Sequence, residues 1–244
     1  MSELPPLRDL PLFASVDEPT LGRLALDAKV ERFEDGGVIF RQGDAITAIV
    51  VIIEGFAKLL RIASSGDETL IGILSNGDSI NDAPSRSDEI YRVSAEAVGP
   101  TSVLKLPAGR FTRLIRESPS LAEAVIRDAK HRIGALIGEI ESLKAHNADQ
   151  RLARFILSRC PPGEDRRRFR LPYDKRLVAA RLGVTQETLS RAFAKLRDLG
   201  VRTEAREVFV ESVARLASQC DDLGRQSRFL SDRRPRNAES RNVV

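Results

Sequence analysis

The sequence contains very little cysteine. Only Cys160 and Cys220 occur among 244 residues, and neither belongs to a CxxC pair. This excludes a disulfide framework and a four-thiolate iron–sulfur cluster. We expect both thiols to be reduced and to behave as small apolar side chains, as free cysteines commonly do.

Signatures of catalysis, metal binding and membrane insertion are also missing. The chain has no glycine-rich phosphate loop, no combined Ser, His and Asp set, and no metal-ligand spacing. Its first residues lack a basic region followed by an apolar run, and its longest apolar run, residues 45–53, is about half a membrane span. We therefore expect a cytoplasmic protein that is not an enzyme, holds no metal and does not enter a membrane.

What the sequence does contain is a strongly basic segment within a nearly neutral chain. The formal net charge is +4, but residues 151–202 hold fourteen Lys and Arg against five Asp and Glu, an excess of nine. Such a block predicts a polyanionic partner, and nucleic acid is favoured over a membrane surface. The length of 244 residues is typical of two modest domains.

The first half of the chain alternates short apolar runs with turn residues. Strands are predicted at 38–40, 49–53, 58–62, 69–74 and 103–106. Glycine-containing segments that can adopt a turn or a left-handed backbone are predicted at 42–44, 54–55, 65–67, 76–78 and 99–100. This spacing predicts a β-barrel or jelly roll rather than βαβ units. A short helix over 17–28, with Asp17 as its N-cap, precedes the barrel.

Residues 118–147 change to a helical period with a heptad seam. The seam residues are spaced alternately three and four apart: Ile126, Ala129, Ile133, Leu136, Ile140 and Leu143. A seam over about three heptads predicts a helix that pairs with its copy in a homodimer. The alternative is that the seam packs on the barrel. Leu121, Val125 and Ile137 lie on a partly different face, so both uses are available.

The second domain is predicted to begin at residue 148. A hinge is predicted at 146–148, then a helix over 151–158 that the Pro-Pro-Gly segment at 161–163 ends. The domain continues to residue 220. The remaining segment, 221–244, contains six arginines and little apolar pattern, which predicts a disordered basic tail.

Residues 174–201, DKRLVAARLGVTQETLSRAFAKLRDLGV, predict a helix-turn-helix. A first helix over 175–182 contains Ala179 at the point where the two helices approach closely, and Gly183 permits the sharp turn between them. Thr185 is the predicted N-cap of the second helix. We expect the inward-facing residues to be Val184, Leu189 and Phe193. This arrangement places a second helix in the DNA major groove, and the alternating residues 201–211 and 168–171 predict a β-sheet wing.

Three polar residues of the second helix are the candidates for reading DNA bases. Glu187, Ser190 and Arg191 are spaced i, i+3 and i+4, so they share one face. Arginine can bond guanine, glutamate can accept from cytosine, and serine can do either. The flanking residues Gln186, Thr188 and Lys195 are candidates for phosphate contacts, and the N-cap Thr185 is counted among the DNA-binding candidates. The alternative is a surface helix in which Glu187 merely pairs with Arg191.

Taken in this order, the segments resemble the Crp/Fnr family of bacterial regulators over roughly residues 7–217. RQGD at 41–44 and EGFAKLLR at 54–61 resemble the family's cyclic-nucleotide-binding-like sensor domain. The resemblance implies an α+β fold with a sensor β-roll (1–117), a dimerisation helix (118–147), a winged helix-turn-helix (148–220) and the tail (221–244). It also implies a transcription activator that binds double-stranded DNA and contacts RNA polymerase.

The pattern of Glu187, Ser190 and Arg191 resembles that of the Fnr-type branch, which implies a TTGAT…ATCAA-like palindrome as target. LPYDKRLVAARLG (171–183) and IGEIESLKAHNADQRLARFIL (137–157) resemble the branch that regulates denitrification and nitric oxide responses. We therefore expect a regulator that responds to a small-molecule, redox or nitric oxide signal through its N-terminal domain.

The effector itself has several candidates. Cyclic-nucleotide-binding relatives hold their ligand with a Gly-Glu pair and an Arg-Ser-Ala run, which are replaced here by residues 77–79 (GDS) and 91–95 (YRVSA). Asp78 and Arg92 are candidate contacts, but the altered pattern disfavours a cyclic nucleotide. Haem bound through His131, which could face the barrel from the long helix, is another option. The alternatives are a cyclic-nucleotide-responsive regulator, an effector-independent regulator with an empty barrel, and a ligand-binding regulatory subunit whose basic domain is incidental.

Overall fold

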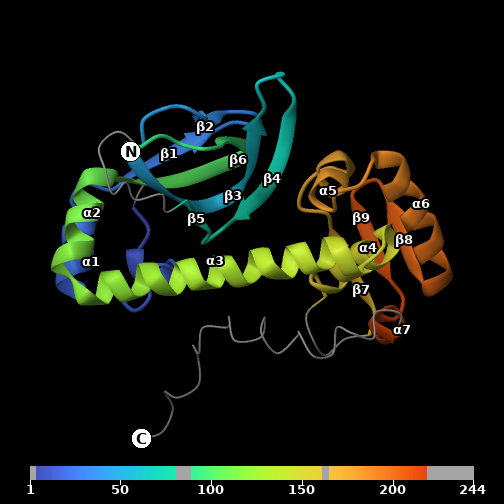
Figure 1. Cartoon of the computed structure of the whole chain (residues 1–244). Helices are drawn as coiled ribbons and strands as arrows, with labels where there is room; N and C mark the ends of the chain where they lie inside the picture. Colours follow the sequence, from blue (N-terminus) through green and yellow to red (C-terminus); the bar gives the residue numbers. More distant parts are fainter. Residues whose placement is uncertain (1–3, 81–88, 161–164, 219–244) are drawn as a thin grey trace, which may run out of the picture. The chain divides into compact units, whose positions relative to one another are not determined.

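The computed structural model describes residues 4–80, 89–160 and 165–218. The chain divides into two compact units, Met1–Glu141 and Ser142–Val244 (Figure 1). The predicted helix stop at 161–163, the predicted tail at 221–244 and Cys220 lie outside the described residues. No helix in the described ranges combines the length and apolarity needed to cross a bilayer.

The first unit is an antiparallel β-roll flanked by helices. Its strands are β1 (Lys29–Phe33), β2 (Val38–Phe40), β3 (Ala48–Ile62), β4 (Glu68–Ser75), β5 (Ser79–Ile80) and β6 (Ser94–Pro107). The strand order is β1-β6-β3-β4, with β2 paired to β6 and β5 paired to β3. The helical elements are η1 (Leu7–Asp9), α1 (Glu18–Ala25), α2 (Ala108–Glu117) and α3 (Pro119–Ala145). The predicted β-roll and long helix are therefore confirmed.

Two of the predicted segments do not reverse the chain, because both lie inside long strands, although Gly55 and Gly99 do adopt the left-handed backbone that was the other option. Glu54-Gly55 forms a bulge within β3, where the register with β6 shifts on either side of Glu54. Gly55 has φ +85°, and a Cβ there would lie 2.5 Å from the carbonyl oxygen of Pro100. Gly99 and Pro100, the second of these segments, lie within β6 and face this bulge across the sheet. Positive φ at Gly55 serves a bulge rather than a reversal of the chain.

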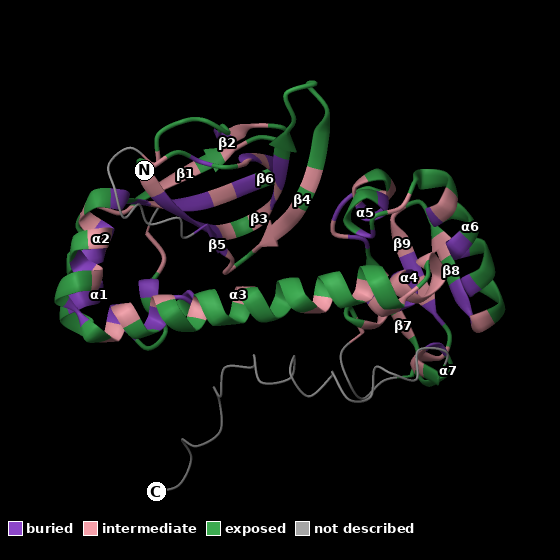
Figure 2. Ribbon diagram, viewed as in Figure 1, coloured by how far each residue is buried: buried purple, intermediate pink, exposed green. Residues whose placement is uncertain are grey.

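The β-roll unit has two apolar clusters, one against its helices and one inside the roll. Phe13, Leu104, Phe111 and Leu121 belong to the first cluster, which joins the sheet to α1, α2 and the start of α3 (Figure 2). The second cluster fills the roll and contains Phe40 stacked on Tyr91 with ring centroids 3.9 Å apart. The helices therefore cover one side of the sheet, and the second cluster lies within the roll.

Asp17 joins the beginning of α1 to the beginning of α3. Its carboxylate accepts hydrogen bonds from the Thr20 backbone N–H, the Thr20 hydroxyl and the hydroxyls of Ser118 and Ser120. The Ser120 hydroxyl is the largest of the influences that lower the pKa of Asp17 from 3.8 to about 2. The predicted N-cap is confirmed, and it has a second role in anchoring α3.

Replacing Asp17 with asparagine is expected to reduce the free energy of unfolding at neutral pH. The lowered pKa means that the ionised carboxylate stabilises the fold above about pH 4, and that this contribution is lost as the pH falls towards 2. The wild-type protein and D17N should therefore converge in stability over that interval. Denaturant unfolding at a series of pH values measures this. A difference that stays constant down to pH 2 would contradict the assignment.

The second unit is a winged helix-turn-helix, as predicted. Its helical elements are α4 (Ala148–Leu157), α5 (Lys175–Arg181), α6 (Gln186–Leu196), η2 (Arg197–Leu199) and α7 (Val213–Ser218). Its strands β7 (Arg167–Arg170), β8 (Val201–Glu204) and β9 (Glu207–Val210) form an antiparallel sheet in the order β7-β9-β8. Asn147 and Gln150 form a capping box at the start of α4. Burial raises the pKa of the Cys160 thiol, which fits the expected unreactive role.

Candidate nucleic-acid interface

The turn between α5 and α6 is built from local signals that the sequence displays. Asp174 caps α5 by accepting from the Leu177 N–H at 2.7 Å, and Thr185 caps α6 by accepting from the Thr188 N–H at 3.2 Å. Gly183 has φ +63°. Leu189 and Phe193 are buried on the inner face of α6. This confirms the predicted positions of the turn and of the inward-facing residues, with Val184 half-buried.

Replacing Gly183 with alanine is expected to cost about 1–3 kcal/mol of stability, because a Cβ is strained at positive φ. The new Cβ would also lie 3.0 Å from Cδ2 of Leu143. Thermal or denaturant unfolding measures the loss. Gly109→Ala in α2 is the matched control, because a Cβ added at Gly109 would meet no neighbouring atom within 4 Å. Equal stability of G183A and G109A would contradict the role given to the turn.

The three predicted reading residues lie together on the exposed face of α6. Arg191 and Glu187 form an ion pair with a 3.7 Å separation between nitrogen and oxygen, and their side chains are 69% and 82% exposed. The Ser190 hydroxyl donates to the carbonyl of Gln186 at 2.9 Å, so its lone pairs remain available to accept. The face is solvent-accessible, and its one internal ion pair is weak because it is exposed.

The residues predicted to flank this face have different surroundings. Thr185 and Thr188 are joined through their hydroxyls at 3.0 Å as part of the cap, whereas Gln186 is exposed. Lys195 forms an ion pair with Asp149 in the first turn of α4, at 2.7 Å. Sequence reasoning missed Asp149, because only the packing of α4 on α6 brings it to Lys195.

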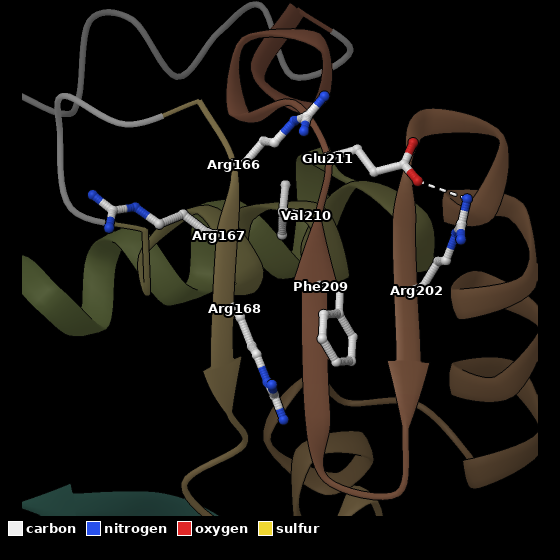
Figure 3. Close-up of a pocket in the computed structure, with 7 residues that line it drawn as sticks. All are labelled: Arg166, Arg167, Arg168, Arg202, Phe209, Val210 and Glu211. Atoms are coloured by element: carbon white, nitrogen blue, oxygen red, sulfur yellow. Dashed lines mark ion pairs between the residues drawn. The ribbon is translucent and has the colours of Figure 1, made fainter.

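Arginines also gather at the wing sheet, where sequence reasoning did not place a site. A hollow of about 550 Å³ lies there, and Figure 3 draws the residues that line it. It is lined by Arg166, Arg167, Arg168, Arg202, Phe209, Val210 and Glu211. The Arg168 guanidinium lies 5.0 Å from the centre of the Phe209 ring, and Arg202 pairs with Glu211 at 2.7 Å. The guanidinium groups point in different directions, so they form a broad basic surface rather than a converging cradle (Figure 3).

The predicted seam of α3 is exposed over its whole length. Figure 2 shows this helix as largely exposed after its first turns. The large apolar residues with exposed fractions between 46% and 60% are Ile126, Ile133, Leu136, Ile137, Ile140 and Leu143, which we call the α3 stripe. Ala129 is exposed as well, whereas Leu121 and Val125 pack against the barrel as expected. The suggestion that Ile137 serves the barrel is wrong, because Ile137 is 60% exposed.

The candidate effector residues do not converge on one site. Asp78 accepts from the N–H and the hydroxyl of Ser75 at 2.8 and 2.9 Å, so its carboxylate holds the turn before β5. Arg92 and His131 are both exposed, so neither is held in an enclosed site of the protomer. Within the described ranges, no group of three His, Cys, Asp or Glu residues could hold a metal ion.

A separate hollow of about 340 Å³ lies on the β-roll. It is lined by Ile39, Phe40, Asp44, Ala45, Thr47, Ala48, Val50, Tyr91 and Lys105. Its lining mixes apolar side chains with the Asp44 carboxylate, the hydroxyls of Thr47 and Tyr91 and the Lys105 ammonium group. Asp78, Arg92 and His131 are not part of this lining. Sequence reasoning missed this hollow, because its residues come from separate strands with no common motif.

Comparison with known proteins agrees with the architecture. Residues 30–118 match the cyclic nucleotide-binding domain family, and residues 150–219 match the Crp-like helix-turn-helix domain family. The chain is 27% identical over 209 residues to the transcriptional activator protein anr of Pseudomonas aeruginosa, covering 82% of this chain and 84% of that protein. It is 25% identical over 200 residues to the nitrogen fixation regulation protein FixK of Bradyrhizobium diazoefficiens, covering 80% and 82%.

A solved structure gives the same assignment at higher identity. A protein of Ruegeria pomeroyi, described as a candidate cyclic nucleotide binding protein, is 32% identical, with a TM-score of 0.65 and coverage of 88% of this chain and 95% of that one. In this chain the two matched domains lie on either side of the long helix α3. The chain therefore belongs to the Crp/Fnr family of DNA-binding transcription regulators.

Proposed function

We propose that the protein works as a homodimer whose two copies of α6 bind a palindromic DNA site. The observation that carries this proposal is the α3 stripe. Its six large apolar side chains are 46–60% exposed on one helix, and monomeric proteins rarely leave so continuous an apolar surface in water. Five of these six residues belong to the predicted seam, which is completed by Ala129. The seam is spaced alternately three and four residues apart, and this spacing packs against its own copy in a coiled coil.

The proposed target is a TTGAT…ATCAA-like palindrome. Glu187, Ser190 and Arg191 share an exposed face of α6, and the order of these three residue types resembles that of the Fnr-type branch. In a symmetric dimer, two such helices meet half-sites about one turn of DNA apart, which explains why the site would be a palindrome. Phosphates beside each half-site would meet the basic surroundings of α6.

The test combines the oligomeric state with DNA binding. Light scattering gives the mass of the purified full chain, and fluorescence anisotropy gives its affinity for the palindrome and for a shuffled duplex across a series of salt concentrations. We expect a dimer that prefers the palindrome and whose affinity falls steeply with salt. A monomer, or equal and salt-independent binding of both duplexes, would overturn the proposal and favour a regulatory subunit with an incidental basic domain.

The N-terminal β-roll is proposed to receive a small-molecule, redox or nitric oxide signal, after which the dimer activates transcription through RNA polymerase. His131 does not fit haem, since its side chain is exposed to solvent on α3. The engaged carboxylate of Asp78 likewise gives little support to a cyclic nucleotide. A Soret band that shifts with nitric oxide would favour haem, and DNA binding that cAMP strengthens would favour the cyclic-nucleotide alternative. Full DNA binding without any addition would favour an effector-independent regulator.

A further inference from the structure

An ion pair joins α4 to α6 at the edge of the proposed DNA-reading face. Lys195 Nζ lies 2.7 Å from Asp149 Oδ2. Lys195 follows Arg191 by about one turn of α6, so it lies on the side of the helix that carries the reading residues. The two helices are packed together within the second unit, which fixes the distance between the two residues.

The two partners of this ion pair are held very differently. The Asp149 side chain is 29% exposed, whereas that of Lys195 is 70% exposed. Asp149 lies in the first turn of α4, where a carboxylate interacts favourably with the helix dipole, and the capping box of Asn147 and Gln150 fixes this turn. Lysine has a long flexible stem, so Lys195 is the partner that can exchange Asp149 for another anion.

A DNA phosphate is the anion that would compete for Lys195. An exposed ion pair contributes little stability, so the exchange itself is easy, but it leaves the Asp149 carboxylate unneutralised close to the DNA backbone. The cost of that like-charge approach opposes the exchange. Phosphate contacts add affinity for every sequence, so a lysine that is held back lowers sequence-independent binding.

We propose that Asp149 is a positioning residue that restrains Lys195 and thereby limits the sequence-independent part of DNA binding. This inference rests on the proposed function, since it requires α6 to face DNA. It goes further by assigning a role to a carboxylate outside the helix-turn-helix. It also changes the expected role of Lys195, from a free phosphate contact to one that an internal carboxylate controls.

The test is a double-mutant cycle with D149N, K195Q and D149N/K195Q in the full chain, measured on the shuffled duplex across a series of salt concentrations. We expect D149N to bind about threefold to tenfold more tightly at 50 mM salt, with a salt slope steeper by about 0.9 per protomer, which corresponds to one added phosphate contact. When Lys195 is already replaced by glutamine, the Asp149→Asn change is expected to raise the affinity much less.

Glu18→Gln is the matched control, since it also removes one negative charge and one ion pair, that with Arg8, but lies at the start of α1 in the β-roll unit. A gain with E18Q as large as that with D149N would mean that net charge alone is responsible. A gain that persists fully in the K195Q background would mean that Asp149 simply repels DNA. Either result overturns the inference. If the wild-type chain binds DNA and D149N binds it with the same affinity, the inference is overturned as well. If the wild-type chain shows no salt-dependent binding, the proposed function itself fails.

Thermal unfolding separates these effects from misfolding. Asp149→Asn keeps the size of the side chain, and the Asn147–Gln150 capping box does not involve Asp149. D149N is therefore expected to unfold within a few degrees of the wild-type protein. If D149N gained affinity but lost much of its stability, the gain would be explained by disruption of α4. That result would overturn the inference.

Discussion

Leu136→Asp is expected to leave the protein monomeric and to lower its affinity for the palindromic duplex by about a hundredfold or more. That is the order of affinity gained when two DNA-binding units are joined in one dimer, and a monomer would lose it. Leu136 lies in the middle of the α3 stripe and is 53% exposed in the protomer. Its replacement therefore costs the protomer little stability. In a paired seam, however, it would bring two carboxylates together in an apolar interface, and burial of unpaired charge is strongly unfavourable.

The control for this variant is Leu26→Asp, because Leu26 is 76% exposed and lies outside the α3 stripe. L26D is expected to remain dimeric and to bind DNA like the wild-type chain. Light scattering gives the mass of each variant, and anisotropy gives the affinity. A dimeric L136D would show that the stripe is not the dimer interface.

Arg191→Ala is expected to remove discrimination at one base pair of each half-site. A bidentate arginine–guanine contact contributes about 1–3 kcal/mol of discrimination, which corresponds to roughly a 5-fold to 150-fold change for each half-site. The change also frees Glu187 from its 3.7 Å ion pair with Arg191. Affinities measured on a panel of duplexes that differ at single base pairs reveal which position loses its preference.

Arg176→Ala provides the comparison, since Arg176 is an exposed cation on the neighbouring α5. Its loss is expected to weaken binding by a similar factor on every duplex of the panel and to make the salt slope shallower. If R191A behaves in the same way, Arg191 contacts only phosphate, and the assignment of the reading face fails.

The helix-turn-helix could be predicted from the sequence because its determinants are local. Thr185 caps α6 from within one turn, Gly183 supplies the left-handed backbone at the bend, and Leu189 and Phe193 follow the helical period. The α3 helix was predictable for the same reason. Its pairing partner was not, because the same heptad seam suits either a barrel or a second copy of the helix.

Other parts of the structure depend on contacts between distant segments. The sequence pattern around Gly55 predicts a turn, because a bulge that brings a glycine against Pro100 of a neighbouring strand depends on strand pairing that the local sequence does not reveal. The strand β1 and the helix α2 were not predicted, and their positions are set by pairing with β6 and by the first cluster. The partner of Lys195 required the packing of α4 on α6, and the hollow on the β-roll required residues from several strands.

The close approach of Leu143 to Gly183 has a consequence for the history of the family. With a Cβ at position 183 only 3.0 Å from Cδ2 of Leu143, the two positions share one small volume. A lineage that acquires a side chain at 183 is therefore expected to carry a smaller residue at 143, and asparagine is the replacement that the left-handed backbone tolerates best. Leu143 also belongs to the α3 stripe, so such a change at the turn would be accompanied by a change at the last position of that stripe. Correlated substitution at 143 and 183 among relatives would record that shared volume.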